Sequence, residues 1–199
     1  GDELIVYNVS VIGSGDALQS NGKVYLEKTS ILGYGDNILS YGALFFKDCD
    51  LISTYGPHLW MRNTEKNHGA AFVNCTFSTV GNEFTDIARA PNTGSYSFPY
   101  AEVVLINCAL EGVRPGGWGK VGKDTSNLRY WEHNSIYLSD GTPVNVSMRK
   151  PYSRQLTTET DAETIANYSD PAYVLGGWSP LLSPIVLVQP EPAEVDHGG

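Results

Sequence analysis

The stretch that decides the fold is residues 23–53, which reads KVYLEKTSILGYGDNILSYGALFFKDCDLIS. Its first eleven residues and its last eleven residues share one pattern. An alternating run of β-branched or aromatic residues is followed by four residues that are, in order, polar, small, small or polar, and apolar. Both runs are rich in residues that favour strands. The polar positions, Lys28 and Asp48, are 20 residues apart, so the stretch predicts a strand that repeats with a fixed period.

Three further runs have the same pattern: LIVYNVSVIG at 4–13, AAFVNCTFSTV at 70–80 and EVVLINCALEG at 102–112. Aligned on the polar residue, the five runs are spaced by 20, 20, 26 and 33 residues. The aligned polar residues are Asn8, Lys28, Asp48, Asn74 and Asn107. Single strands that repeat through loops of varying length predict an all-β fold, a right-handed parallel β-helix in which each rung, one full turn of the helix, stacks on the last.

The residue after each aligned polar position is predicted to point inward on successive rungs. This column contains Val9, Thr29, Cys49, Cys75 and Cys108. Free cysteines are among the most buried residue types, so these three are expected to be buried and inert rather than reactive. A disulfide between neighbouring rungs is the alternative.

The period is lost after Gly112, and residues 113–135 are predicted to form a long loop rich in glycine and aromatic residues. The segment TETDAETIANYS that follows predicts a short C-terminal helix with Thr158 or Thr160 as its cap. We expect one β-helix domain over residues 1–180, then a strand or linker tail over 181–199 that is rich in proline and glutamate.

Composition narrows the class of protein. The 199 residues are 41% hydrophobic and 18% charged, which is ordinary for a globular domain, and the formal net charge is −9. That charge argues against nucleic acid or an anionic membrane as a partner, because both require a basic surface. No apolar run is long enough to span a membrane, and no cysteine belongs to a C-x-x-C pair.

The motif Gly-x-Gly-Asp occurs twice, ending at Asp16 and Asp36. If residues twenty apart stack, the two carboxylates lie on adjacent rungs, which are separated by about 4.8 Å. One should then hold a proton near neutral pH while the other is an anion, the division of roles that hydrolytic enzymes use between an acid and a nucleophile. The alternative is that each motif is ordinary turn chemistry with no catalytic meaning.

Several segments together resemble the pectin methylesterases, carbohydrate esterase family 8. YNVSVIGSGDAL is similar to the family segment that ends in Gln-Asp-Thr-Leu, and GYGDNILSYGALFFKDCDL to its Val-Asp-Phe-Ile-Phe-Gly segment. IARAPN resembles Leu-Gly-Arg-Pro-Trp, EVVLINCALEGVRPGGW the strand that ends in Pro-x-Gly-Trp, and YVLGGWSP the closing segment. The resemblance keeps its order from Leu4 to Pro180. It implies the same β-helix and removal of methyl esters from galacturonate residues of pectin without metal or cofactor.

The resemblance also implies roles for individual residues. Asp36 is the nucleophile, Asp16 the general acid and then base, and Arg89 the cation that holds the nucleophilic carboxylate. Trp118 is expected to be a sugar-stacking platform, although it could instead be a buried anchor for its loop, and Arg89 could be a solvated loop residue. The partner is a pectin or galacturonan polysaccharide, and the protein is expected to be secreted, periplasmic or at the cell surface.

Other candidate residues follow from loop positions or from departures from the family pattern. Arg62 and Arg114 lie on predicted loops where they could bind galacturonate carboxylates or be plain solvated charges. Gly15 stands where the family has a glutamine, so a side-chain donor to the oxyanion is missing. The first rungs of a complete member are also absent, which suggests further rungs or domains before residue 1. His58 and His68 are expected at the surface.

Two other functions fit the same fold. One is a pectate lyase or polygalacturonase; a lyase should bring a calcium-ligating acidic cluster and a catalytic Arg or Lys, and the sequence shows no such cluster. The other is a β-helix that binds polysaccharide without catalysis, and Gly15 is the feature that keeps this alternative open. Release of methanol from methylated pectin separates an esterase from this binding module.

Overall fold

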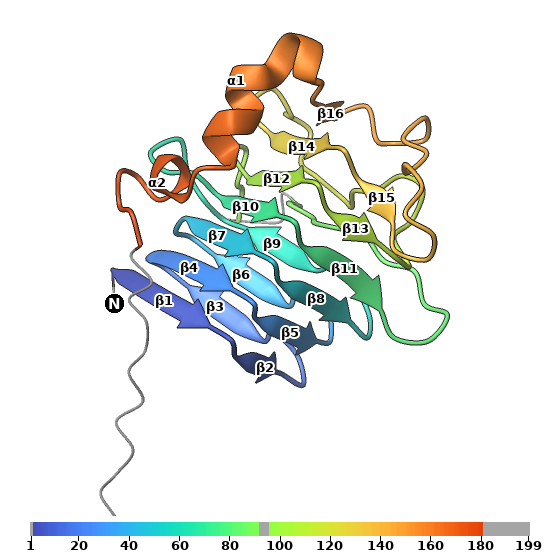
Figure 1. Cartoon of the computed structure of the whole chain (residues 1–199), viewed down its shortest axis with the longest axis horizontal. Helices are drawn as coiled ribbons and strands as arrows, with labels where there is room; N and C mark the ends of the chain where they lie inside the picture. Colours follow the sequence, from blue (N-terminus) through green and yellow to red (C-terminus); the bar gives the residue numbers. More distant parts are fainter. Residues whose placement is uncertain (1, 92–95, 181–199) are drawn as a thin grey trace, which may run out of the picture.

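The computed structural model describes residues 2–91 and 96–180, and within these ranges the chain coils into a right-handed parallel β-helix. Its strands form three parallel sheets on different sides of the coil (Figure 1). The first sheet contains β1 (Glu3–Tyr7), β4 (Lys23–Glu27), β7 (Leu44–Lys47), β10 (Ala70–Val73), β12 (Glu102–Ile106), β14 (Arg129–His133) and β16 (Ser153–Gln155). The second contains β2 (Ser10–Ile12), β5 (Ser30–Gly33), β8 (Asp50–Ser53), β11 (Thr76–Thr79), β13 (Ala109–Leu110) and β15 (Ile136–Tyr137). The third contains β3 (Leu18–Ser20), β6 (Ile38–Ser40) and β9 (Leu59–Met61).

The register of the sheets follows the sequence period. In the first sheet Tyr25 pairs with Ile5 on one side and with Phe45 on the other. Phe45 pairs in turn with Ala71, and Ala71 with Val104. These are the spacings found by aligning the polar residues, so the predicted order of strands is confirmed.

Each rung turns between its first and second sheet at a residue in the left-handed backbone conformation. The value of φ lies between 51° and 54° at these corners, which are Asn8, Lys28, Asp48, Asn74, Asn107 and Asn134. Asparagine and aspartate tolerate this conformation better than most residues, because their short side chains can form local hydrogen bonds. The repeated polar residue of the sequence therefore marks the corner of each rung.

The column after these corners points inward, as predicted. Thr29, Cys49, Cys75 and Cys108 are at most 1% exposed, whereas Val9 is 44% exposed because β1 is the outermost strand of its sheet in the described chain. The three cysteines are free thiols, so the alternative of a disulfide is not found. Burial raises the pKa of Cys75, and it raises that of Cys108 to about 12, which keeps both protonated.

The prediction of a long loop over residues 113–135 is confirmed for residues 113–128 and wrong for residues 129–133, which form a strand. Residues 113–128 form a loop with only isolated bridges, such as Thr85 to Val113 and Ala90 to Val121. The chain then returns to the first sheet as β14, which pairs in parallel with β12, and β16 pairs with β14. The β-helix therefore continues past the last repeat that the sequence pattern showed.

Two helices follow the last strand and pack on the outer face of the first sheet (Figure 1). They are α1 (Thr158–Tyr168) and α2 (Pro171–Val174). The predicted helix is confirmed, but its cap is Thr157, whose N–H donates to the Asp161 carboxylate at 3.0 Å. An apolar layer that includes Tyr25, Phe45 and Val104 is buried between sheet and helices. This layer lies outside the coil and is separate from the main core within it.

None of the helices in the described residues is long and apolar enough to cross a membrane. The predicted tail over 181–199 lies outside the described residues.

Candidate active site

The two Gly-x-Gly-Asp loops stack on each other. β2 pairs with β5 and β3 pairs with β6 in one continuous twenty-residue register, so the connecting loops lie on adjacent rungs. On one side of the aspartates the N–H of Tyr34 donates to the carbonyl of Gly15 at 3.1 Å, and on the other the N–H of Ala17 donates to that of Asn37 at 2.9 Å. Asp16 and Asp36 therefore lie at corresponding places in two stacked loops, although only Asp36 has a positive φ.

Arg89 forms a two-pronged ion pair with Asp36. Its Nε donates to Asp36 Oδ1 at 2.8 Å, and its Nη2 donates to Asp36 Oδ2. The hydrogen bonds to Asp36 raise the pKa of Arg89, and the charges of Asp36 and Asp16 raise it further. A guanidinium held in this way stays charged and fixes both oxygens of one carboxylate. The alternative of a solvated loop arginine does not fit this geometry.

The ring of Trp60 packs against the guanidinium of Arg89. The Ala88 and Leu59 backbones form a bridge between their rungs, and the N–H of Arg89 donates to the Leu59 carbonyl at 3.0 Å. The Arg89 side chain reaches back towards Asp36 with its guanidinium carbon 4.6 Å from the centre of the Trp60 ring. A cation over an indole face gains about 0.5–2 kcal/mol. Sequence reasoning missed Trp60, although its place between the buried Leu59 and Met61 of β9 marks it as outward-facing.

Arg62 lies in an aromatic cluster next to this pair. Its guanidinium carbon is 3.9 Å from the centre of the Trp60 ring, and its Nη1 donates to the Tyr41 hydroxyl at 3.1 Å. The rings of Tyr96 and Phe98 also lie within 6 Å of it. The cluster holds Arg62 on the same side of the coil as Arg89, because both contact Trp60.

The backbone at Asp36 is itself unusual. Asp36 has φ of +46° and follows Gly35, whose φ is +83°. Left-handed conformations outside glycine cost about 1–2 kcal/mol and gather at functional sites. The side chain of Asp36 is only 16% exposed, whereas Asp16 is exposed to solvent. The two carboxylates thus meet different environments, which suits different roles.

Gly15 leaves open space beside Asp16. A Cβ atom built at this position has no heavy atom within 4 Å. The backbone there does not have the positive φ that only glycine favours. The structure therefore has room for the side chain that the family pattern places at this position, but it has none.

Two expectations about candidate residues are corrected by burial. Trp118 is fully buried and stacks on Tyr130 with ring centres 4.7 Å apart, so it is an anchor in the core and its faces cannot stack on a sugar. His58 is also fully buried rather than at the surface, and burial lowers its pKa to about 3. Arg114 is half-exposed and its Nη1 lies 3.2 Å from Asp86 Oδ2, so it is already paired with one carboxylate.

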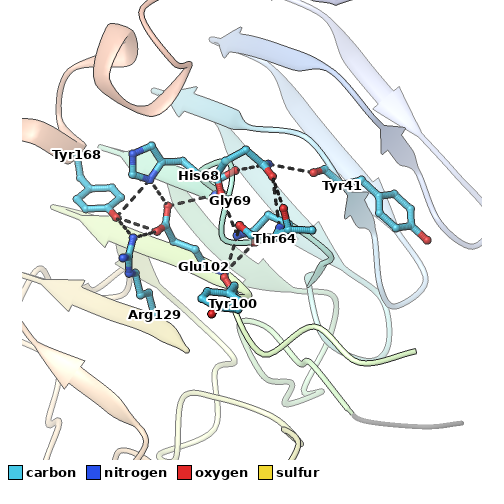
Figure 2. Close-up of polar contacts among 10 residues, drawn as sticks. Tyr41, Thr64, His68, Gly69, Tyr100, Glu102, Arg129 and Tyr168 are labelled. Carbon is cyan, nitrogen blue, oxygen red and sulfur yellow. Dashed lines mark hydrogen bonds and ion pairs between the residues drawn. The ribbon is translucent and has the colours of Figure 1, made fainter. Parts of the chain in front are cut away.

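A second polar cluster lies between the first sheet and α1, and its role is structural (Figure 2). The buried Glu102 accepts hydrogen bonds from the Gly69 N–H, Arg129 and the Tyr168 hydroxyl, and His68 Nδ1 lies 2.8 Å from it. Burial alone would raise the pKa of Glu102, but the hydrogen bond and charge of His68, with Arg129 and Tyr168, lower it. Because Tyr168 belongs to α1, this cluster fastens the helix to the β-helix.

The candidate site therefore contains two carboxylates on stacked loops and one guanidinium that orders the less exposed of them. Such a set can supply a nucleophile and a proton donor without a histidine. Among the described residues, no group of three or more His, Cys, Asp or Glu side chains is arranged to hold a metal ion.

The fold is similar to that of solved pectin methylesterases. The enzyme from Erwinia chrysanthemi shares 21% identity and a TM-score of 0.71, over 92% of this chain and 60% of its own. A pectin methylesterase in complex with a hexasaccharide gives 19% identity and a TM-score of 0.67, over 90% of this chain and 58% of its own. The deglycosylated pectin methylesterase from Aspergillus niger gives 22% identity and a TM-score of 0.60, over 80% of this chain and 54% of its own.

This likeness concerns the fold, because the identities are low and the chain spans little more than half of the length of those proteins. No protein-family model and no curated protein sequence matches the chain.

Proposed function

We propose that this chain is a carboxylic ester hydrolase that removes methyl esters from galacturonate residues of a pectin-type polysaccharide. The observation that carries the proposal is the two-pronged contact of Arg89 with Asp36, next to Asp16 at the equivalent position of the adjacent rung. The similarity of fold to pectin methylesterases supports the choice of substrate. A substrate outside the cell fits a protein that is secreted, periplasmic or at the cell surface.

In the proposed mechanism an Asp36 oxygen attacks the carbonyl carbon of the methyl ester. Asp16 gives its proton to the departing methoxy oxygen, and methanol leaves. The product is an anhydride between Asp36 and the uronate carbonyl. Asp16, now a carboxylate, takes a proton from water, whose oxygen attacks the uronate carbonyl carbon. This frees the uronate and restores both aspartates.

Arg89 holds both oxygens of Asp36 in place before the attack, while the Trp60 ring packs on the guanidinium. We also propose that Arg62 and Arg114 contact uronate carboxylates of the polymer. The platform role of Trp118 is not part of the proposal, because its ring is buried.

The test is an assay of the purified protein with highly methylated pectin that follows three products at once. The proposal predicts methanol release, with no new reducing ends and no unsaturated uronate absorbance. Reducing ends would indicate a polygalacturonase and unsaturated product a lyase. Binding of pectin with none of the three products would indicate the non-catalytic module, which the empty space at Gly15 favours.

A further inference from the structure

A pair of exposed aromatic rings lies beside the Asp36 loop. The rings of Tyr34 and Tyr55 stack with centres 5.2 Å apart and planes 22° from parallel. Tyr34 is 57% exposed and Tyr55 is 60% exposed. Rings that pack against each other and still expose more than half of their surface form an apolar patch that the core does not use. We call these two residues the tyrosine platform.

The β-helix holds the tyrosine platform in place. Each tyrosine is followed by a glycine with positive φ, +83° at Gly35 and +73° at Gly56. A Cβ atom at Gly35 would lie 2.7 Å from the carbonyl oxygen of Tyr55, so only glycine lets the two loops approach this closely. Because the backbone fixes the two loops and the rings already stack on each other, binding costs little ordering of these side chains.

The tyrosine platform lies close to the candidate active site along the backbone. Tyr34 stands two residues before Asp36 in the same loop. The N–H of Asp36 donates to the carbonyl of Pro57 at 2.7 Å, and Pro57 stands two residues after Tyr55. A polymer whose ester lies at Asp36 would therefore pass next to these rings.

The next rung carries another exposed aromatic residue at the corresponding place. Phe84 is 59% exposed and stands two residues before Asp86, whose carbonyl accepts a hydrogen bond from the His58 N–H at 3.2 Å. The N–H of Arg114 donates to the carbonyl of Thr85, the residue after Phe84, and the Arg114 side chain is 52% exposed. Phe84 and Arg114 therefore stand on adjoining backbone segments, and the half-exposed Arg114, which is paired with Asp86, still offers part of its guanidinium to a ligand with a negative charge.

We propose that the tyrosine platform is a polysaccharide subsite on which a uronate ring of the polymer stacks, with Phe84 and Arg114 extending it along the coil. A pyranose ring presents an apolar face of C–H groups while its hydroxyls stay in water, which matches exposed rings better than a buried pocket does. This subsite is distinct from the Trp60 and Arg62 cluster. The identity of the polymer rests on the proposed function.

The experiment measures binding without catalysis. Retardation in native gels that contain polygalacturonate, methylated pectin or a neutral glucan gives an apparent Kd for each polymer. We compare the wild type with the pair Tyr34→Ala and Tyr55→Ala, and with the ring-preserving pair Tyr34→Phe and Tyr55→Phe. Tyr173→Ala, which removes another exposed tyrosine on α2, is the matched control.

We expect the alanine pair to weaken binding of both uronate polymers at least about tenfold, and the phenylalanine pair and the control to stay within about threefold. Both tyrosines are more than half exposed, so circular dichroism should show an intact fold. The subsite is overturned if the wild type binds neither uronate polymer, if the alanine pair binds as the wild type does, or if the phenylalanine pair loses as much as the alanine pair.

A separate assay keeps this result apart from the proposed function. Methanol release from the methyl ester of a single galacturonate, which has no second ring to stack on the tyrosine platform, tests the Asp36 chemistry alone. A protein that binds polymer through the tyrosine platform but releases no methanol from any substrate would retain the subsite and lose the esterase. Equal methanol release by wild type and alanine pair on the single-sugar ester, with weaker use of the polymer, would support both.

Discussion

At the scale of single residues, the candidate site depends on Arg89 reaching Asp36 across the rung that carries Trp60. Replacing Arg89 with alanine removes the cation that orients both oxygens of Asp36 beside the second carboxylate, Asp16. We therefore expect kcat to fall by at least about tenfold, because a misplaced nucleophile reacts more slowly. Arg89→Lys should restore kcat only in part, because an ammonium cannot reproduce the two-pronged contact.

The measurement is kcat for methanol release by the wild type and both variants. An Arg89→Ala protein with the wild-type kcat would mean that Arg89 does not position Asp36.

At Gly15 we predict that a substitution raises activity. The space at this position is open and its backbone suits any residue, so Gly15→Gln should place an amide donor beside Asp16 without disturbing the fold. A single oxyanion donor changes kcat by about 10²–10³ in other enzymes. We expect a rise in kcat of at least about tenfold with little change in KM, and no rise for the matched control Gly15→Ala, which fills space without a donor. A Gly15→Gln variant no faster than that control would contradict the assignment of this position.

The sequence alone could predict Asp16, Asp36 and Arg89, because the first two follow from the period and all three lie in segments that resemble a family. It could not predict Trp60 or the tyrosine platform, since their neighbours come from rungs separated by loops of unequal length. The platform role expected of Trp118 rested on the resemblance, and a glycine-rich loop has no strand alternation from which to choose between that role and a buried anchor.

At the scale of elements, the corner residue of each rung controls how well the strands stack. Asn74 is exposed and has φ of +54°. Asn74→Ala places an ordinary side chain in the left-handed region and should lower the free energy of unfolding by about 1 kcal/mol. Asn74→Gly, the matched control, should cost less because glycine accepts this conformation freely.

Urea unfolding of the two variants and the wild type checks this order. Equal losses for alanine and glycine would show that the asparagine side chain, and not the backbone conformation, stabilises the corner.

The strands that the sequence predicted are those in which the corner residue and the alternating run occur together. β14 was missed because the glycine-rich segment before it breaks the spacing, even though Asn134 marks its corner as in the other rungs. The bounds of α1 were close, but its cap was misplaced, because the choice between neighbouring threonines depends on Asp161 folding back to the Thr157 N–H.

At the scale of the whole molecule, burial of His58 makes the fold sensitive to acid. Both ring nitrogens are buried without a hydrogen-bond partner, and burial lowers the pKa of His58 to about 3. The unfolded chain takes up this proton near pH 6.5, whereas the folded chain resists it, so stability is lost as the pH falls from about 6.5 towards 3. The loss is about 1.4 kcal/mol for each pH unit in that window.

Urea unfolding at about pH 7.5 and about pH 5 measures the loss of stability that His58 causes. Glu102 does not interfere, because its pKa is lowered and its contribution to the free energy of unfolding is lost only below about pH 4.5. The wild type should lose about 2 kcal/mol more than His58→Leu between these values. The leucine variant should also be more stable near neutral pH, because it removes two unpaired polar atoms from the core. Equal losses for the two proteins would show that His58 is not held neutral by the fold.

The central claim is that Asp36 is the nucleophile of an ester hydrolase, and the most direct measurement is methanol release from methylated pectin by Asp36→Asn. Asp48→Asn is the matched control, since Asp48 has φ of +52°, close to the +46° of Asp36, but lies at a rung corner away from Arg89. We predict a loss of at least about 10³-fold in kcat for Asp36→Asn and wild-type turnover for Asp48→Asn. An Asp36→Asn protein that releases methanol within a few-fold of the wild-type rate would contradict the account.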